Sequence, residues 1–387
     1  MIDLFRPSYA DARATWLALA AARGLAVESH LHPLRGPQGE VLAMDVVRDG
    51  PADAENLLLT TSAVHGVEGH GGCGIQAGLL QVGESLRTLA GPRTALLHVH
   101  AVNPHGFAHG RRVNEDNIDL NRNFIDFSQP LPDHPDYAAV HALLLPATWP
   151  PTAQNEAALQ AQLDAMGPRR AQMAITRGQH SHPGGLYFGG LAPAWSNTTF
   201  RAVLQRHAAG CRHLAWIDLH SGLGPSGVGE RIFASFDTGA ALARARQWWG
   251  DGVTSVHTGS STSIPMTGPI QAAVDSACPQ AAYTGICLEF GTVPLPQMIG
   301  ALRADHWLHQ PPRGRCRAGQ RHPAADPHGL LHRHASLEAG LVDTGPAGHA
   351  AGPGGPGWLT PTQSSAALQP PAATPPACPA LDTPPAG

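Results

Sequence analysis

The sequence predicts an α/β fold in which a mixed, largely parallel sheet is flanked by helices. Short, continuous apolar runs recur along most of the chain and are separated by stretches with helical periodicity. Apolar runs of this length without polar alternation are typical of strands that are buried on both faces. With 387 residues, the chain is long enough to bury a sizeable core in one large α/β domain or two smaller ones.

The predicted elements follow one another in an alternating order. A helix is expected over residues 9–22, with Ser8 as its N-terminal cap. Five apolar runs predict strands, and two further stretches predict helices, of which the second is expected to pack on the sheet. The strands are "EVLAMDVVRDG" (40–50), "NLLLTTSAV" (56–64), "TALLHVHAV" (94–102), "HLAWIDLH" (213–220) and "GICLEF" (285–290), and the helices are "GIQAGLLQVG" (74–83) and "LPQMIGALRADHWLHQ" (295–310).

The C-terminal segment, residues 311–387, has a different composition. It holds 15 Pro and 11 Gly among its 77 residues and lacks Phe, Ile, Met, Tyr and Asn. Such a segment cannot bury enough apolar surface to offset the entropy lost on ordering. We therefore expect a folded domain over residues 1–310 and a disordered tail over 311–387. The tail is either a genuine low-complexity segment or the product of a frame change in GC-rich DNA.

Charge and cysteine content narrow the classes of function. The 25 basic residues face 29 acidic ones without a long run of one sign, so neither nucleic acid nor a membrane surface is expected as a partner. All 25 basic residues are arginine, which excludes Schiff-base chemistry and a phosphate-loop lysine. The six cysteines are irregularly spaced and include no CxxC pair. The N-terminus does not have the pattern of a secretory signal, and no run of 18 apolar residues occurs. We expect reduced thiols and a cytoplasmic location.

Four separated stretches place polar residues at the end of a predicted strand. They are "HGVEG" (65–69), "NPHGFAHGRRVNEDNIDLNRNF" (103–124), "DLHSG" (218–222) and "LEFGT" (288–292). In open α/β sheets, functional sites form outside the carboxyl ends of the strands. The four stretches are therefore expected to share one cleft.

His65 and Glu68 are candidate metal ligands. They are three residues apart, which brings both side chains to the same side of a turn, close enough to share one cation. His220 is a candidate third ligand, because a His, Glu and His set leaves a fourth tetrahedral position for water, as in catalytic zinc sites. The alternative is that His65 only forms a hydrogen bond within a loop and that Glu68 is solvated.

The general base is expected outside the "HGVEG" stretch. Zinc motifs of the HxxEH type are helical, whereas glycines at positions 66, 69, 71 and 72 favour a loop, since each costs about 0.8 to 1 kcal/mol relative to alanine in a helix interior. In a loop, Glu68 is a better ligand than base. Glu289 is the candidate base, because it ends an apolar strand where partial burial raises a carboxyl pKa. A water-exposed strand end is the alternative for Glu289.

Together, the four stretches resemble the zinc carboxypeptidase family, the carboxypeptidase A-like metallopeptidases, and in particular a bacterial cytosolic branch of it. That family contains an HxxE pair, a later His, an NPxG…R…DxNRNF block and a glutamate on a late strand, and all four are present here between about Ser8 and Gln310. The resemblance implies a three-layer α/β/α fold with one Zn²⁺ per chain.

The resemblance also implies roles for individual residues. His65, Glu68 and His220 would bind the zinc ion, and Asp119 of "DLNRNF" would orient His65. Of the remaining residues, Asn121 and Arg122 would bind the carboxylate of the substrate. Arg112 would stabilise the developing oxyanion, and its neighbour Arg111 is a further candidate for binding the substrate.

The expected activity is hydrolysis of an amide bond next to a carboxylate, with Glu289 taking a proton from zinc-activated water. Carboxypeptidase activity on peptides is the default, and deacylation of N-acyl amino acids, as in the aspartoacylase group, is a sibling alternative. A non-catalytic relative that keeps zinc for structure is the alternative from another class. The stretch "RGQHSHPGGLYFGG" (177–190) is expected either as a substrate loop, with Tyr187 or Arg177 reaching inward, or as an ordinary surface loop.

Overall fold

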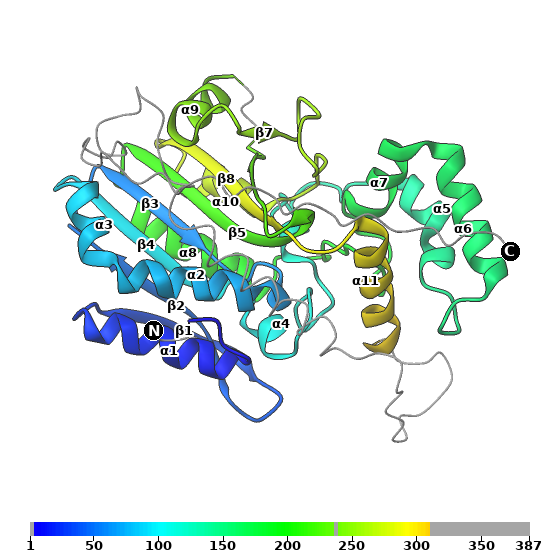
Figure 1. The fold of residues 1–387 in the computed structure, drawn as a ribbon, viewed down its shortest axis with the longest axis horizontal. Coiled ribbons are helices and arrows are strands. Elements are labelled where there is room, and N and C mark those ends of the chain that lie inside the picture. The colour runs from blue at the N-terminus through cyan, green and yellow to red at the C-terminus, as the bar shows by residue number, and fades with distance from the viewer. Residues whose placement is uncertain (1–3, 236–238, 310–387) are drawn as a thin grey trace, which may run out of the picture.

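The computed structural model describes residues 4–235 and 239–309. The expected tail, residues 311–387, lies outside the described residues, so its disorder and its origin stay predictions. In the described residues, a twisted sheet forms the centre of the molecule, and helices cover both of its faces (Figure 1). The sheet is mixed and largely parallel, which confirms the predicted fold class.

The sheet contains eight strands in the order β1-β2-β4-β3-β5-β8-β6-β7. The pairs β4/β3, β3/β5, β5/β8 and β6/β7 are parallel, and the pairs β1/β2, β2/β4 and β8/β6 are antiparallel. Four consecutive parallel strands, β4-β3-β5-β8, therefore occupy the centre of the sheet, where burial on both faces selects continuous apolar runs. The strands are β1 (Val27–Arg35), β2 (Val41–Asp49), β3 (Asn56–Thr61), β4 (Thr94–His100), β5 (His213–Ser226), β6 (Gly229–Phe233), β7 (Thr254–Ser255) and β8 (Ala282–Gly291).

Helices pack on the two faces of the sheet. On one face, α1, α2, α3 and α9 cover the strands, and on the other face α8 and α10 lie against them (Figure 1). The first helix is capped by Ser8, whose side chain accepts a hydrogen bond from the N–H of Asp11 at 3.1 Å. The bounds are α1 (Tyr9–Ala22), α2 (Gly69–Gln81), α3 (Gly83–Ala90), α4 (Pro104–Ala108), α8 (Trp195–Ala208), α9 (Ala240–Trp249) and α10 (Ala273–Ala277), with short 3₁₀ turns at Gly66–Glu68, Leu120–Arg122 and Ile270–Ala272.

The largest apolar core lies between the sheet and α8 with α10. Leu57 and Leu59 of β3, Trp216 of β5 and Phe200 of α8 are buried together there. Neighbouring residues of the same strands, such as Ile217, point to the opposite face and pack with α9. This double burial explains why the central strands are apolar at consecutive positions.

A second group of helices lies beyond one end of the sheet (Figure 1). This helical lobe consists of α5 (Pro135–Leu144), α6 (Ala153–Met166), α7 (Pro168–Thr176) and α11 (Leu295–His309). It has its own apolar cluster, which includes Tyr137, Leu144 and Tyr187.

The helix expected over residues 295–310 is present as α11, but its packing differs from the expectation. Its Arg303 donates to the carbonyl oxygen of Leu144 at 2.7 Å and pairs with Glu156 of α6 at 2.6 Å, and its Ile299 and Leu302 contact the lobe cluster. The helix therefore packs against α5 and α6, because its partners in ion pairs and apolar contacts lie there.

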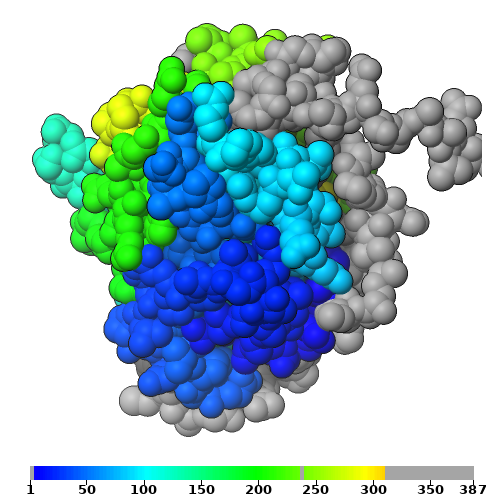
Figure 2. Space-filling view, turned by 90° about the vertical axis from the view of Figure 1, so that its left-hand side faces the viewer, coloured from blue at the N-terminus to red at the C-terminus, as the bar shows by residue number. Residues whose placement is uncertain are grey.

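The N-terminal elements are remote from the helical lobe. Seen from the opposite end of the molecule, α1 and the β1–β2 hairpin form a continuous surface, coloured blue in Figure 2. The other predicted strands and helices are confirmed with small changes of boundary, of which the largest is the extension of β5 to Ser226. In the described part of the chain, no helix combines the length and the apolar character needed to cross a membrane.

Candidate active site

The "HGVEG" stretch forms a turn followed directly by a helix. His65 precedes the 3₁₀ turn Gly66–Glu68, and α2 begins at Gly69. The expectation that the surrounding glycines form a loop is therefore wrong for Gly69 and the residues after it. Close packing explains why glycine occurs in the turn and at the start of the helix: a Cβ atom on Gly66 would lie 2.1 Å from the backbone of Gly106, and one on Gly69 would lie 2.6 Å from the ring of Phe107.

His220 and Glu289 are neighbours on two central strands. In the parallel pair β5/β8, His220 is the register partner of Glu289, and Asp218 is the partner of Cys287. Residues two apart in a strand point to the same face, so these four side chains gather on one side of the sheet. The two strands thus place an imidazole and a carboxylate side by side, next to the turn that carries His65.

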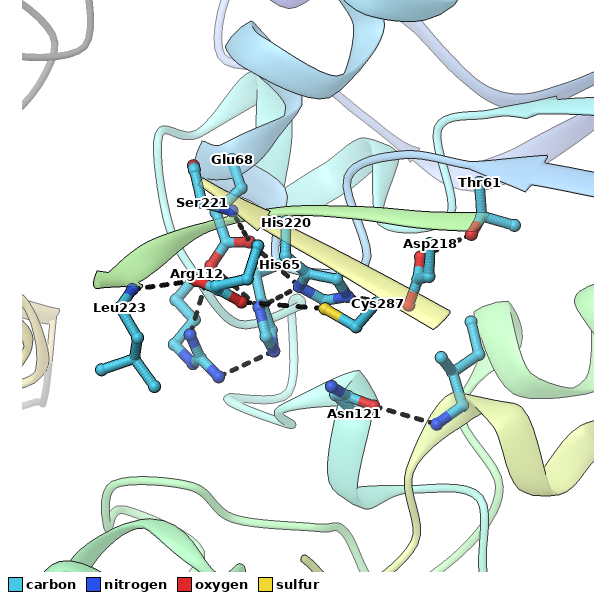
Figure 3. Close-up of polar contacts among 12 residues, drawn as sticks. Thr61, His65, Glu68, Arg112, Asn121, Asp218, His220, Ser221, Leu223 and Cys287 are labelled. Carbon is cyan, nitrogen blue, oxygen red and sulfur yellow. Dashed lines mark hydrogen bonds and ion pairs between the residues drawn. The ribbon is translucent and has the colours of Figure 1, made fainter. Parts of the chain in front are cut away.

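The three candidate ligands converge, as Figure 3 shows. The Nδ1 atoms of His65 and His220 are 3.2 Å apart, Nδ1 of His65 is 2.9 Å from Oε1 of Glu68, and Nδ1 of His220 is 3.1 Å from Oε2 of Glu68. Two nitrogen ligands of a tetrahedral zinc ion lie about 3.3 Å apart when the zinc–nitrogen bonds are about 2.0 to 2.1 Å long. The spacing and the donor types therefore fit a zinc ion.

Both histidines turn their second ring nitrogen toward a buried carboxylate. Nε2 of His220 lies 2.7 Å from Oδ2 of Asp218, and Nε2 of His65 lies 3.2 Å from Oδ1 of Asp119. Carboxylates in this position fix the ring orientation and strengthen a histidine as a metal ligand. Asp119 occurs where the sequence placed it, whereas Asp218 was missed, although its position two residues before His220 on a predicted strand was a usable signal.

Asp218 is itself held by a chain of buried hydrogen bonds. The hydroxyl of Thr61 donates to Oδ1 of Asp218 at 2.5 Å, and the indole N–H of Trp216 donates to the same hydroxyl at 2.8 Å. All of these side chains lie in the interior of the sheet. The orientation of His220 therefore depends on a rigid part of the fold.

The charges of the cluster are strongly coupled. Burial by itself would raise the pKa of Glu68, but the two adjacent histidines together hold it well below its usual value. For His220, burial would lower the pKa, yet the contacts with Asp218 and Glu68 raise it well above its usual value. The carboxylate of Glu68 thus stays ionised beside an imidazole that retains a proton, and a bound cation would take the place of that proton.

Glu289 lies in the same pocket with a different environment. Burial, followed by the nearby charge of Glu68, raises the pKa of Glu289 to about 7. Its Oε1 accepts a hydrogen bond from the N–H of Leu223 at 2.9 Å, and the thiol of Cys287 lies 3.8 Å from its Oε2. A carboxyl group with this pKa can exchange a proton near neutral pH.

The adjacent arginines 111 and 112 point to different places. Nη2 of Arg112 lies 2.7 Å from Nε2 of His65, Nε of Arg112 pairs with Asp119 at 3.0 Å, and the guanidinium also lies 3.3 Å from Glu68. Arg111 pairs with Asp305 of α11 at 2.9 Å and does not line the pocket. The structure therefore brings Arg112 to the cluster and directs Arg111 toward the helical lobe.

Arg122 is a buried cation without an ion-pair partner among the described residues. Its Nε and Nη2 donate to the carbonyl oxygen of Thr176 at 3.1 and 2.6 Å, and Nη1 donates to the carbonyl oxygen of Asn121 at 2.8 Å. The side-chain oxygen of Asn121 accepts from the N–H of Ile270 at 2.9 Å. Both Asn121 and Arg122 line the pocket, where an anion would supply the missing negative charge.

One pocket connects all of these groups. Of the residues expected in the site, Arg111 and Asp119 are not part of its wall. Its polar wall holds the candidate ligands with Glu289 and the residues of the "DLNRNF" block, and its apolar wall comes from β6, α11 and the segment before residue 270. The lining residues are His65, Glu68, Arg112, Asn121, Arg122, Gln172, Thr176, Tyr187, His220, Ser221, Gly222, Leu223, Ile232, Ala234, Ser263, Ile264, Met266, Gln271, Cys287, Glu289, Leu295 and Met298.

Most of the chain matches a known sequence family. A family model described as "Protein of unknown function (DUF2817)" matches residues 5–326. The chain belongs to the DUF2817 family. No curated protein sequence matches it significantly.

Solved structures with similarity to this DUF2817 protein share little sequence with it. Carboxypeptidase A from Helicoverpa armigera is 12% identical, with 86% of this chain and 73% of that chain covered, at a TM-score of 0.42. Thrombin activatable fibrinolysis inhibitor is 13% identical, with 87% and 74% covered, at a TM-score of 0.47. Succinylglutamate desuccinylase/aspartoacylase from Rhodobacter sphaeroides is 14% identical, with 73% and 64% covered, at a TM-score of 0.35.

In the DUF2817 protein, Cys287 was not expected in the pocket, and Tyr187 was expected there only as one of two alternatives. Cys287 lies close enough to His220 and Glu289 for the three to form a second group able to hold a metal ion. Its position two residues before Glu289 on a predicted strand was a usable signal. Tyr187, which belongs to the stretch 177–190, lines the pocket, whereas Arg177 of the same stretch does not.

Proposed function

We propose that the chain is a zinc-dependent hydrolase that cleaves an amide bond next to a carboxylate. One observation carries the proposal: a single pocket is lined by a group of residues able to hold a metal ion, a half-buried acid of raised pKa and a buried guanidinium without an ion-pair partner. Each of these features is costly to bury and is typical of functional sites. Such a hydrolase needs a metal site, a group that transfers a proton and a cation that binds the substrate carboxylate, and these three features correspond to them.

In this proposal, His65, Glu68 and His220 hold the zinc ion. Two imidazoles and one carboxylate form a ligand set that leaves a position open, as in catalytic zinc sites. A bound Zn²⁺ supplies a Lewis acid that lowers the pKa of water toward neutrality and polarises a carbonyl oxygen. Asp218 and Asp119 keep the two histidines oriented toward the ion.

Glu289 acts as the proton carrier. Its carboxylate takes a proton from the water that attacks the amide carbon and passes this proton to the departing amine. A raised pKa suits both steps, because the group must accept the proton and then release it at the same pH. The N–H of Leu223 holds one of its oxygens, so the other faces the pocket and the thiol of Cys287.

The two pocket arginines divide the remaining tasks. Arg112 lies beside His65 and Glu68, where its charge would stabilise the oxygen of the amide as it becomes negative. Arg122, with the side-chain amide of Asn121, would bind the carboxylate of the substrate, since a buried guanidinium without an anion favours such a partner.

The test compares two substrate panels with one substitution. Purified chain with zinc is assayed on N-blocked dipeptides and on N-acyl amino acids, and hydrolysis of either panel separates peptidase from deacylase activity. In Glu289→Gln, we expect hydrolysis to fall by about 10²- to 10⁴-fold while zinc stays bound, because only proton transfer is removed.

The matched control is Glu230→Gln, since Glu230 is the register partner of Glu289 on β6 but does not line the pocket. We expect this variant to keep its activity. An equal, measurable rate in wild type and Glu289→Gln would contradict the role of Glu289, and no hydrolysis of either panel would favour the non-catalytic zinc-binding alternative.

A further inference from the structure

Tyr187 has an unusual backbone conformation. Its φ is +53°, and the described residues include two other non-glycine residues with positive φ, Ala63 and Asn117. The left-handed region is unfavourable for a bulky side chain, so the surrounding structure must hold Tyr187 in place. Such outliers cluster at functional sites.

The backbone around Tyr187 is tied to the motif block. The carbonyl oxygen of Tyr187 accepts from the N–H of Gln179 at 3.1 Å, and the next residue, Phe188, accepts from the N–H of Asp119 at 2.8 Å. Farther along, the side chain of Asn123 donates to the carbonyl oxygen of Gly189 at 2.8 Å. The loop is therefore fixed to the same segment that supplies Asp119, Asn121 and Arg122.

The ring of Tyr187 joins the helical lobe to the pocket. It is only 5% exposed and belongs to the apolar cluster that includes Tyr137 of α5 and Ile175 of α7. At the same time it lines the pocket, with the guanidinium carbon of Arg112 at 5.1 Å and that of Arg122 at 5.3 Å from its centroid. One aromatic ring thus contacts both pocket arginines.

The contact of the Tyr187 ring with both guanidinium groups is electrostatically favourable. Two guanidinium groups in one buried pocket repel each other, and an aromatic ring attracts each of them through its negative face. The ring is rigid and packed, so it also limits how far either guanidinium can move. Arg112 is thereby kept next to His65 and Glu68, and Arg122 is kept next to Asn121.

We propose that Tyr187 is a positioning residue that holds Arg112 and Arg122 at a fixed separation, so that the amide and the carboxylate of one substrate are bound together. The inference rests on the proposed function and extends it, because the helical lobe then takes part in substrate selection through this ring. The phenol oxygen is not needed for this role, since the contacts are made by the ring.

The experiment compares Tyr187→Phe, Tyr187→Leu and Tyr137→Leu in the zinc-loaded full chain. Two properties are measured: kcat/KM on the better substrate panel, and calorimetric binding of N-benzoylglycine against its uncharged analogue, N-benzoylglycinamide. Tyr137 is the matched control, because it is fully buried in the same cluster and, in contrast to Tyr187, forms no cation–π contact with Arg112 or Arg122 in the described part of the chain.

The expected results separate positioning from general stability. Tyr187→Phe retains kcat/KM and the preference for the carboxylate ligand. Tyr187→Leu loses that preference and lowers kcat/KM by about 10- to 100-fold, because the arginines are no longer held. Tyr137→Leu lowers the melting temperature and leaves the ligand preference intact.

Two outcomes would overturn the inference. One is a wild-type chain without preference for N-benzoylglycine, and the other is a Tyr187→Leu variant that keeps the wild-type preference. Failure of the proposed function looks different: wild type hydrolyses neither panel, yet the ligand preference and its loss in Tyr187→Leu are still measured by calorimetry and still support the role of Tyr187.

Discussion

The Nδ1 atoms of His65 and His220 lie 3.2 Å apart, although 155 positions separate the two residues in the sequence. The sheet explains this proximity, because β3 and β5 are adjacent and parallel, with Thr61 paired to Asp218. The residues that follow these two strands therefore lie at the same edge of the sheet. The next strand, β8, adds Glu289 directly beside His220. The candidate site is thus a consequence of strand order and register.

The carboxylates behind the two histidines are expected to control metal affinity. Asp119→Asn and Asp218→Asn should each weaken zinc binding by about 10- to 100-fold, since an amide orients an imidazole less well. Competition with a chromogenic chelator measures the affinity. Asp45→Asn is the control, because Asp45 is an equally buried acid that pairs with Arg13 outside the pocket. Equal affinities in all three variants would show that these carboxylates do not support a metal.

The neighbouring arginines are expected to differ in function. Arg112→Gln should lower kcat/KM by about 10²- to 10³-fold, because it removes a cation beside the position of the developing negative charge. Arg111→Gln breaks the ion pair with Asp305 and should mainly lower the melting temperature. Steady-state kinetics and thermal unfolding of both variants check the difference. The assignment fails if Arg111→Gln is the variant with the larger loss of kcat/KM.

His100 is expected to make the fold sensitive to acid. Burial lowers the pKa of His100 from 6.5 to about 4, and neither ring nitrogen has a hydrogen-bond partner among the described residues. Between these pH values the unfolded chain binds the extra proton, so the free energy of unfolding falls as the pH drops from 6.5 toward 4 and is fully retained above 6.5. His100→Phe should remove up to about 3 kcal/mol of this dependence.

Urea unfolding at several pH values measures the effect. His98→Phe is the comparison, since burial lowers the pKa of His98 to about 4 as well, but His98 also shares a hydrogen bond of 2.8 Å with the hydroxyl of Thr60. Removing His98 should therefore reduce the pH dependence in the same way and, because a buried hydroxyl loses that partner, also destabilise the protein at every pH. An unchanged pH dependence in His100→Phe would contradict the interpretation.

Two glycines of α2 are expected to respond in opposite ways to alanine. A Cβ atom on Gly69 would lie 2.6 Å from the ring of Phe107, so Gly69→Ala should destabilise the fold. Gly71 has nothing within 4 Å of that position, so Gly71→Ala should stabilise the protein by up to about 1 kcal/mol through helix propensity. Free energies of unfolding of the two variants test this contrast. Similar values for both would mean that packing does not explain the glycines.

Much of the fold could be predicted from the sequence where burial leaves a simple pattern. The central strands are apolar at consecutive positions because both of their faces are covered, and "NLLLTTSAV" and "GICLEF" show this directly. The edge strand β1 was missed, since its exposed positions, such as Leu31 and Leu34, interrupt any regular pattern. The strand β7 was also missed, because its two residues, Thr254 and Ser255, are too few to form a pattern.

At the start of α2, the prediction from helix propensity was wrong. Four glycines in seven residues argue against a helix, yet α2 forms; a Cβ atom on Gly66, Gly69 or Gly72 would lie within 2.9 Å of another atom, which explains these three glycines, whereas Gly71 has open space. Helix propensity contains no information about tertiary packing of this kind. The direction of neighbouring side chains is equally hidden, as Arg111 and Arg112 show by contacting different elements.

The most direct test of the account is a crystal structure of the purified chain with anomalous diffraction measured at the zinc absorption edge. We predict one zinc ion per chain, bonded at about 2.0 to 2.2 Å to His65, Glu68 and His220 together. A zinc ion bound only by other side chains, such as Cys287 with Glu289, or a fully loaded protein in which His220 points away from the ion, would contradict the central claim.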